Sequence, residues 1–151
     1  HFHILRQVDA WFDAHRSSPA VAVEAPLLFE SGLDKRCDAI VLITADRAGK
    51  LARLAERDGL SADDASLRLS RQLDDAYLAA RCDRVVVMDN GQVVMDDTPK
   101  AVFSQAERLR AMRLDVPPMV ALGDLLRARG LPVAHEAMDV SAMAQEVLKC
   151  R

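Results

Sequence analysis

Three arginines between positions 53 and 68 are the side chains of this sequence best suited to chemistry. Arg53 and Arg57 lie four residues apart, so on a helix they share one face, and Arg68 follows on the next expected helix. A guanidinium group binds two phosphate oxygens at once and spreads their charge, as phosphoryl transfer requires. The alternative is a solvated, arginine-rich helix face in a chain with only four lysines among its 20 basic residues.

The sequence contains no loop of the kind that grips phosphate. Its one Gly-Lys pair, Gly49-Lys50, has Thr44 where a Walker loop needs glycine and Leu51 where it needs Ser or Thr. Dinucleotide-binding glycine patterns are absent as well. We therefore expect Gly49-Lys50 to lie on a helix surface, and we expect any catalysis to need residues beyond these.

Helix and strand patterns alternate in the first part of the chain, which is typical of an α/β fold. Apolar spacing and a Ser61–Asp64 capping pair predict helices, and short apolar runs predict buried parallel strands. The expected helices are residues 1–16, 46–57 and 61–72, and the expected strands are residues 20–25 and 39–44.

A β-hairpin and a wholly helical tail are expected next. Asn90-Gly91 separates VVVM from QVVM, and this dipeptide favours the positive φ angles of a tight hairpin turn. Capping residues and prolines then mark helix starts at Thr98-Pro99, Ser104 with Glu107, Pro117-Pro118, and Asp139 or Ser141, with Gly130 closing the helix that follows Pro118.

Four motifs in the first part resemble those of dephospho-coenzyme A kinases. They are HFHI at residues 1–4, APLLFESGLD at residues 25–34, RLAERDGLSADDA at residues 53–65 and RLSRQ at residues 68–72. Phe2 stands where the family has proline. The order and spacing of the four motifs make the resemblance specific, and it extends over about residues 1–84.

The resemblance implies both an activity and a set of site residues. These kinases transfer the γ-phosphate of ATP, with Mg²⁺, to the ribose 3′-hydroxyl of dephospho-coenzyme A, the last step of coenzyme A synthesis. The implied acceptor side comprises His1, Pro26, Leu27, Leu28 and Glu30, the implied lid comprises Arg53, Arg57 and Arg68, and Asp89 and Asn90 are implied near the adenine. Core packing of the two leucines and a helix-surface position for the histidine are the alternatives. The family's phosphate loop precedes the segment that HFHI resembles, and this sequence lacks it.

The second part resembles a different family. Residues 83–103, DRVVVMDNGQVVMDDTPKAVF, and the Leu-Asp-Val-Pro at residues 114–117 are similar to the C-terminal end of the ATPases of energy-coupling-factor (ABC-type) transporters. In those ATPases the catalytic elements precede the position of Asp83, where this chain has AYLAARC. The resemblance implies a tail for packing or subunit contacts, and a membrane subunit as its partner.

The two resemblances together predict a composite chain. We expect a partial P-loop-NTPase-like three-layer fold of parallel strands with helices, followed by the hairpin and the helical tail. Residues 1–84 would be the acceptor side and lid of the kinase, and residues 85–151 the ATPase-like part. A truncated or chimeric chain is favoured over a working fusion, so few contacts are expected across residues 82–90. The expected function is the kinase, with this chain inactive alone; the alternatives are a transporter motor subunit driving vitamin or metal-ion uptake and a non-catalytic interaction fragment.

Composition excludes several other classes of protein. A net charge of −3 over 151 residues gives no broad basic surface for nucleic acid. No apolar run approaches the roughly 20 residues of a membrane helix, and the sequence opens with no signal-like leader. Cys37, Cys82 and Cys150 are isolated, which indicates neither a disulfide framework nor a metal site. We expect a soluble, cytoplasmic protein whose partner is the small molecule dephospho-coenzyme A.

Overall fold

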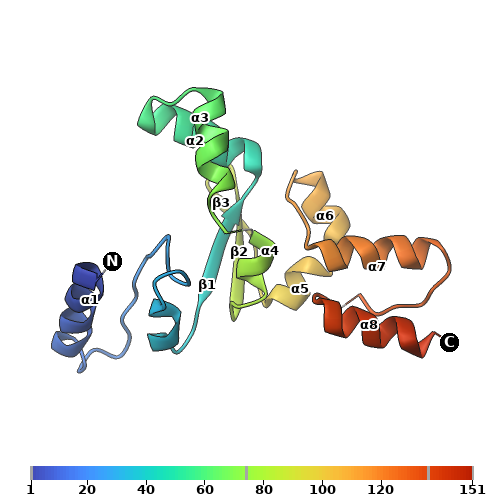
Figure 1. Ribbon diagram of the computed structural model, residues 1–151, viewed down its shortest axis with the longest axis horizontal. Coiled ribbons are helices and arrows are strands. Elements are labelled where there is room, and N and C mark those ends of the chain that lie inside the picture. The colour runs from blue at the N-terminus through green and yellow to red at the C-terminus, as the bar shows by residue number, and fades with distance from the viewer. Residues whose placement is uncertain (1, 74, 136, 151) are drawn as a thin grey trace. The chain divides into compact units, whose positions relative to one another are not determined.

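The computed structural model describes residues 2–73, 75–135 and 137–150. The chain divides into two compact units, His1–Ala39 and Ile40–Arg151. Helices combine with a short sheet, so the predicted α/β class is confirmed (Figure 1). Within the described residues, every helix is too short or too polar to cross a lipid bilayer.

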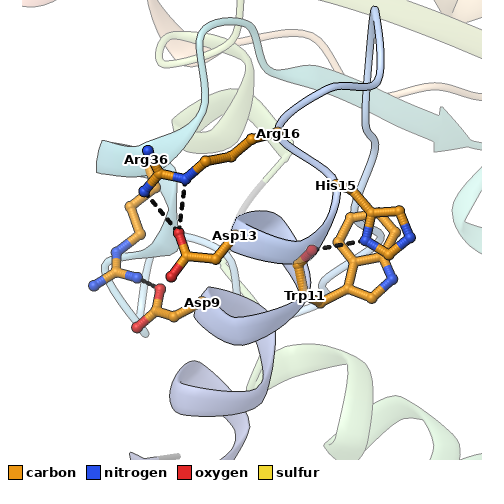
Figure 2. A network of polar contacts seen from close by, with 6 residues as sticks. All are labelled: Asp9, Trp11, Asp13, His15, Arg16 and Arg36. Carbon is orange, nitrogen blue, oxygen red and sulfur yellow. Dashed lines mark hydrogen bonds and ion pairs between the residues drawn. The ribbon is translucent and has the colours of Figure 1, made fainter.

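The first unit is built on one amphipathic helix, as its apolar spacing predicts. Helix α1 spans Phe2–Ala14, and a short 3-10 helix, η1, spans Leu33–Arg36. Figure 2 shows the ion pair between Arg36 of η1 and Asp9 of α1, which ties the two helices together. Leu33, the first residue of η1, is buried. The 3-10 helix is therefore held by an apolar contact as well as by the ion pair of Arg36.

The end of α1 carries its own polar contacts (Figure 2). Arg16 pairs with Asp13 at 2.7 Å, and His15 Nδ1 donates to the Trp11 carbonyl at 2.7 Å. The His15 and Trp11 rings lie 4.4 Å apart between centroids. These contacts close the last turn of the helix, whose final carbonyl groups have no partner within the helix itself.

The strand predicted over residues 20–25 is wrong. This segment has no strand hydrogen bonding, and its side chains are exposed or half-buried. Ala22 and Val23 instead line an open apolar hollow with Ile4, Val8 and Trp11 of α1. A buried strand needs neighbouring strands to satisfy its backbone, and the prolines that flank this run at both ends cannot donate to a ladder.

The second unit contains a mixed three-stranded sheet in the order β1-β2-β3. Its strands are β1 Val41–Ala45, β2 Arg84–Asp89 and β3 Gln92–Asp97. Strands β1 and β2 are parallel, and β2 and β3 are antiparallel with an irregularity between Val87 and Met88. The Asp83 carboxylate accepts a hydrogen bond from the Ile40 N–H at 2.8 Å, which helps to align β1 with β2. The strand predicted over residues 39–44 is therefore confirmed with a small shift.

The crossover between β1 and β2 consists of helices, which are α2 Arg47–Asp58, α3 Ala62–Ser70 and α4 Asp75–Ala79. Helix α2 begins after Asp46, whose carboxylate accepts from the Gly49 N–H at 2.8 Å, and it ends at Gly59. Helix α3 begins after Ser61, whose hydroxyl accepts from the Asp64 N–H at 3.1 Å. The Ser61 cap is the one that the sequence predicts, and Asp46, expected as the first residue of its helix, is the N-cap. Helices α2 and α3 extend together beyond the end of β1 (Figure 1).

The hairpin between β2 and β3 has the predicted turn. Asn90 and Gly91 have φ angles of 47° and 77°. Two consecutive positive φ angles define a turn whose twist matches that of the strands, and asparagine and glycine are the residues that adopt it most easily.

The tail is helical, as predicted, with the helices α5 Pro99–Phe103, α6 Ala106–Ala111, α7 Pro118–Ala128 and α8 Val140–Lys149. Thr98 and Asp139 cap α5 and α8, and Gly130 follows α7 with a φ angle of 86°. The helix start predicted at Ser104 is wrong. The Ser104 hydroxyl donates back to the Ala101 carbonyl at 2.8 Å, so Ser104 closes α5 instead.

The main core of the second unit joins the hairpin to the tail. Its buried residues come from α4, β2, β3, α5, α6 and α7; they are Ala79, Val85, Val87, Met95, Val102, Phe103, Ala106, Leu109, Leu114 and Val120. A second, smaller cluster lies between α7 and α8 around Val133 and Met143. On β1, Val41 and Ile43 are 52% and 67% exposed, so this strand contributes little to either core.

The expectation of few contacts across residues 82–90 is wrong. Strand β2 occupies this stretch, pairing in parallel with β1 on one side and antiparallel with β3 on the other. Val85 and Val87 are fully buried within the main core. The junction between the two resemblances therefore runs through the centre of the sheet, where hydrogen bonds and packing hold both parts together.

Asp124 joins α6 to α7. Its carboxylate accepts hydrogen bonds from Arg110 at 2.6 Å and from Arg127 at 2.5 Å. Burial alone would raise the pKa of Asp124, but the hydrogen bonds and charges of the two arginines outweigh it and lower the pKa below its ordinary value. The carboxylate is therefore more stable in the folded protein than in the unfolded chain.

We expect Asp124→Asn to lower the free energy of unfolding by about 1 kcal/mol at pH 7. Because the folded-state pKa is lowered, this stabilisation is present above the ordinary aspartate pKa of about 3.9 and is lost as the pH falls below it. Urea unfolding of both proteins at pH 7 and pH 3 measures the effect. The exposed Asp115, changed to Asn, is the control; a difference that persists undiminished at pH 3 would contradict the assignment.

Candidate functional site

The carboxyl edge of the parallel strands is the natural place for a ligand in this fold. Strand pairing places Ala45 of β1 beside Met88 of β2. The start of α2 and the hairpin turn at Asp89 and Asn90 therefore lie at the same edge of the sheet. Parallel α/β sheets bind their ligands at the carboxyl ends of the strands.

Asp89 and Asn90, predicted near the adenine, form the hairpin corner at this edge. The Asn90 Nδ2 group donates to Asp89 Oδ1 at 3.3 Å, and Asn90 is exposed. Both side chains are thus close enough to act together on one ligand group. The amide keeps a carbonyl oxygen and a second N–H that could contact a base edge.

A polar cluster lies at the end of β1. The Lys50 ammonium group donates to Asp75 Oδ2 at 2.5 Å and to the Thr44 hydroxyl at 3.3 Å, and Thr44 also donates to Asp75. Thr44 is buried, and the Lys50 side chain is only 25% exposed. Gly49 and Lys50 lie on α2, which has no buried residue, as expected, and the Lys50 side chain contacts Thr44 and Asp75. The cluster ties the first residues of α4 to the base of α2, where the crossover leaves and rejoins the sheet.

Two of the three predicted arginines meet on a single carboxylate. Arg57 Nε lies 2.7 Å from Asp58 Oδ1, and Arg57 Nη2 lies 3.1 Å from Asp58 Oδ2. Arg68 Nη1, from the next helix, lies 2.5 Å from the same Oδ2. The structure thus brings together guanidinium groups from α2 and α3.

The contacts with arginine keep Asp58 ionised. The hydrogen bond from Arg57 lowers the pKa of the Asp58 carboxyl, and the charges of Arg57 and Arg68 add to this effect against the smaller influence of burial. The hydrogen bond to Asp58 in turn raises the pKa of Arg57. Asp58 and Arg57 are therefore both charged at neutral pH.

Arg53 is not part of this group. It is exposed on α2, and it forms no ion pair with any residue that the structure describes. Arg57 lies 11 residues beyond Asp46, which is about 16 Å along the helix axis. The arginine pair therefore lies at the end of α2 that is far from the carboxyl edge of the sheet.

The predicted acceptor-side residues belong to the first unit. Pro26, Leu27, Leu28 and Glu30 lie in consecutive turns before η1, and the prediction for His1 falls outside the described residues. Leu27 is 42% exposed and Leu28 is half-buried, so the alternative of simple core packing is wrong. The Leu28 carbonyl accepts bonds from the Leu33 N–H and from the Ser31 hydroxyl, both at 3.1 Å, which fixes the shape of the turns.

The cysteines offer no reactive group at this site. Burial, followed by the charge of Asp83, raises the pKa of the Cys82 thiol to about 11. Burial is also the main cause that raises the pKa of Cys37. These two groups stay as thiols at neutral pH, and a thiolate is the form that attacks or binds metals. Among the described residues, no three His, Cys, Asp or Glu side chains are arranged to hold a metal ion.

Sequence reasoning missed two members of the site. Asp58 stands in the Arg-Asp-Gly motif, and that motif was a usable signal because two arginines within reach of one carboxylate predict an ion pair. Asp75 carries no such signal. Its partners Lys50 and Thr44 are 25 and 31 residues away in the sequence, so only the tertiary structure brings them together.

The helices that carry Arg57 and Arg68 connect the parallel strands β1 and β2. The family model for dephospho-CoA kinase matches residues 1–96, and the chain belongs to this family. The match extends beyond residue 84 and includes most of the hairpin.

Individual kinases show the same similarity. The dephospho-CoA kinase of Rhodopseudomonas palustris is 40% identical over 80 residues, which is 52% of this chain and 40% of that protein. The dephospho-CoA kinase of Symbiobacterium thermophilum is 36% identical over 83 residues, which is 55% of this chain and 34% of that protein.

Transporter ATPases are also similar to part of the chain. The energy-coupling factor transporter ATP-binding protein EcfA1 of Symbiobacterium thermophilum is 44% identical over 73 residues, which is 48% of this chain and 24% of that protein. The chain thus spans between a quarter and two fifths of the length of these relatives.

Proposed function

We propose that this chain supplies the lid and the acceptor side of a dephospho-CoA kinase, which phosphorylates the ribose 3′-hydroxyl of dephospho-CoA with ATP. The observation that carries the proposal is the meeting of Arg57 and Arg68 on one carboxylate, on the helices between two parallel strands. A carboxylate held by two guanidinium groups occupies them much as phosphate oxygens do. Family membership selects phosphoryl transfer among the reactions that such a pair could serve.

The residues present fit a phosphate group better than they fit the metal. Arg57 and Arg68 offer the donors that phosphate oxygens need, and Asp89 with Asn90 offers polar groups at the sheet edge. ATP and Mg²⁺ would supply the transferable phosphoryl group and part of its charge neutralisation. The described residues include no cluster of three possible metal ligands, so we assign no residue to Mg²⁺.

In the proposed reaction, the residues of this chain position the substrate and neutralise the charge of the phosphoryl group. Arg57 and Arg68 hold charge that develops on the transferring group, and Arg53 is available on the same face of α2. Pro26, Leu27, Leu28 and Glu30, together with His1, would form the acceptor side. The family and the small-molecule substrate favour a cytoplasmic location, which we include in the proposal.

We expect the 151-residue chain by itself to phosphorylate dephospho-CoA at no useful rate, because its sequence contains no Walker loop to hold the β- and γ-phosphates. Incubation with labelled ATP and dephospho-CoA, followed by separation of the products, measures this. Turnover by the purified chain that disappears on changing a residue within it would contradict the expectation.

The similarity to transporter ATPases supports a second candidate, an ATP-binding subunit that drives uptake of a vitamin or a metal ion with a membrane subunit. In this view residues 85–151 are the ATPase-like part, residues 1–84 are the kinase-like part, and the chain is truncated or chimeric. Co-purification with a transporter membrane subunit, with no binding of dephospho-CoA, would favour this candidate over the kinase. Partner binding without either activity would favour an interaction fragment.

A further inference from the structure

Asp58 lies behind the two arginines that meet on it. The side chains of Arg57 and Arg68 are 69% and 53% exposed, whereas the side chain of Asp58 is only 22% exposed. The Asp58 side chain is thus the least exposed of the three, although Asp58 as a whole residue is exposed. An anion that approaches from solvent therefore meets the arginines first.

The arginines keep most of their donors after binding Asp58. Each guanidinium group carries five N–H donors, and Asp58 takes two from Arg57 and one from Arg68. No other described residue accepts a hydrogen bond from either guanidinium group. The remaining donors of both groups are available for a second anion on the exposed side.

The two arginines come from different helices, so their positions are not fixed by one backbone. Arg57 is near the end of α2 and Arg68 is near the end of α3, with a turn at Gly59 between the helices. Asp58 is the one described group that bonds to both. Without it, two long and exposed side chains would each sample many rotamers, and a ligand would have to order them.

We propose that Asp58 is a positioning residue, which holds Arg57 and Arg68 side by side so that their outer donors bind the phosphate chain of a nucleotide or of dephospho-CoA. The inference rests on the proposed function and specifies how its arginines are prepared. The ligand class is a polyphosphate, with the triphosphate of ATP and the diphosphate of dephospho-CoA as the two sources. The lowered pKa of Asp58 agrees with a carboxylate that stays ionised in this role.

For Asp58→Asn, positioning and charge alone predict opposite changes in the affinity for an anion. Asp58→Asn removes a negative charge beside a phosphate site, so simple electrostatics predicts tighter binding of the anion. Positioning predicts weaker binding, because the arginines must then be ordered by the ligand. We expect Asp58→Asn to weaken the binding of inorganic tripolyphosphate to the 151-residue chain by about fivefold.

Glu56→Gln is the matched control for this test. Glu56 lies on the same helix, is exposed, and forms no ion pair with a described residue. Its replacement removes the same charge without touching either arginine. Isothermal titration at low ionic strength should show binding to Glu56→Gln that is equal to or slightly tighter than that of the unaltered chain.

Titrations with other ligands identify the phosphate source. Titrations of arginine variants distinguish a failure of the arginine site from a failure of the positioning role of Asp58. Titration of ATP and of dephospho-CoA in place of tripolyphosphate shows which of the two binds more weakly to Asp58→Asn than to the unaltered chain. Arg57→Ala and Arg68→Ala should each weaken binding of the probe. If neither does, or if the unaltered chain does not bind the probe, the arginine site itself is wrong and the proposed function fails with it. If both arginine variants bind weakly while Asp58→Asn binds at least as tightly as Glu56→Gln, only the positioning role of Asp58 is wrong.

A measurement on the unaltered chain tests the same point without any variant. In side-chain NMR spectra, the Arg57 Nε–H signal should be protected from exchange in the free chain and should change little when tripolyphosphate binds, because Asp58 remains its partner. A large shift of this signal, with a matching shift of the Asp58 carboxyl carbon, would mean that the anion displaces Asp58, and would overturn the proposal.

Discussion

Replacing Arg57 by alanine should lower the rate of phosphoryl transfer by about 100- to 1,000-fold in a kinase that contains this lid. The suitable enzyme is a fusion that places the upstream part of the Rhodopseudomonas palustris kinase in front of residue 1. Arg57 presents a planar fork from the far end of α2, and loss of one such group from a transferring phosphate costs about 2.7 to 4 kcal/mol of transition-state stabilisation. Steady-state rates with ATP and dephospho-CoA measure the loss.

Arg57→Lys distinguishes the contribution of the paired guanidinium hydrogen bonds from that of the positive charge. Lysine keeps the positive charge but cannot donate two parallel hydrogen bonds, so most of the loss should persist. Arg16→Ala is the control, because the Arg16 side chain is 81% exposed and, among the described residues, forms its ion pair with Asp13 (Figure 2). It should change the rate by less than about twofold. Equal and small effects at Arg57 and Arg16 would contradict a lid role and would favour the alternative of a solvated, arginine-rich helix face.

Leu109→Ala should be the most damaging single change to stability. Leu109 of α6 is 1% exposed and lies in the main core with Val85 and Val87 of β2. Truncation of a fully buried leucine leaves a cavity and typically costs about 2 to 5 kcal/mol. Urea unfolding followed by circular dichroism measures the change in the free energy of unfolding.

The same experiment tests whether the two resemblances share one folding unit. Because β2 contributes to the core that Leu109 fills and also pairs with β1, the sheet and the tail should unfold in one transition. Leu125→Ala on α7 is the control, since Leu125 is 62% exposed, and its effect should stay within about 0.5 kcal/mol. A loss below 1 kcal/mol for Leu109→Ala, or a tail that melts separately, would contradict this description of the core.

Local signals in the sequence predict local structure well in this chain. Asp46, Ser61, Thr98 and Asp139 each cap a helix through their own side chains. The hairpin turn at Asn90-Gly91 follows from backbone preferences of two adjacent residues. In each of these cases the residues that carry the signal are within three positions of the structure they determine.

The errors arise where the structure depends on distant partners. The run at residues 20–25 has a strand-like composition, but composition does not show whether a neighbouring strand is present to pair with it. The contact of Lys50 with Asp75 has no local signal in the sequence, because the two residues are 25 positions apart. Asp58 lies next to Arg57 in the sequence, but its bond to Arg68 depends on how α3 folds back beside α2.

The most direct test of the kinase assignment is the product that the fusion makes from ATP and dephospho-CoA. Phosphorus NMR and mass spectrometry of the nucleotide fraction identify whether phosphate is added and at which hydroxyl. We expect a single phosphate on the ribose 3′-hydroxyl, added at a rate that depends on Arg57. A folded fusion that binds ATP and dephospho-CoA but forms no 3′-phosphorylated product would contradict this expectation.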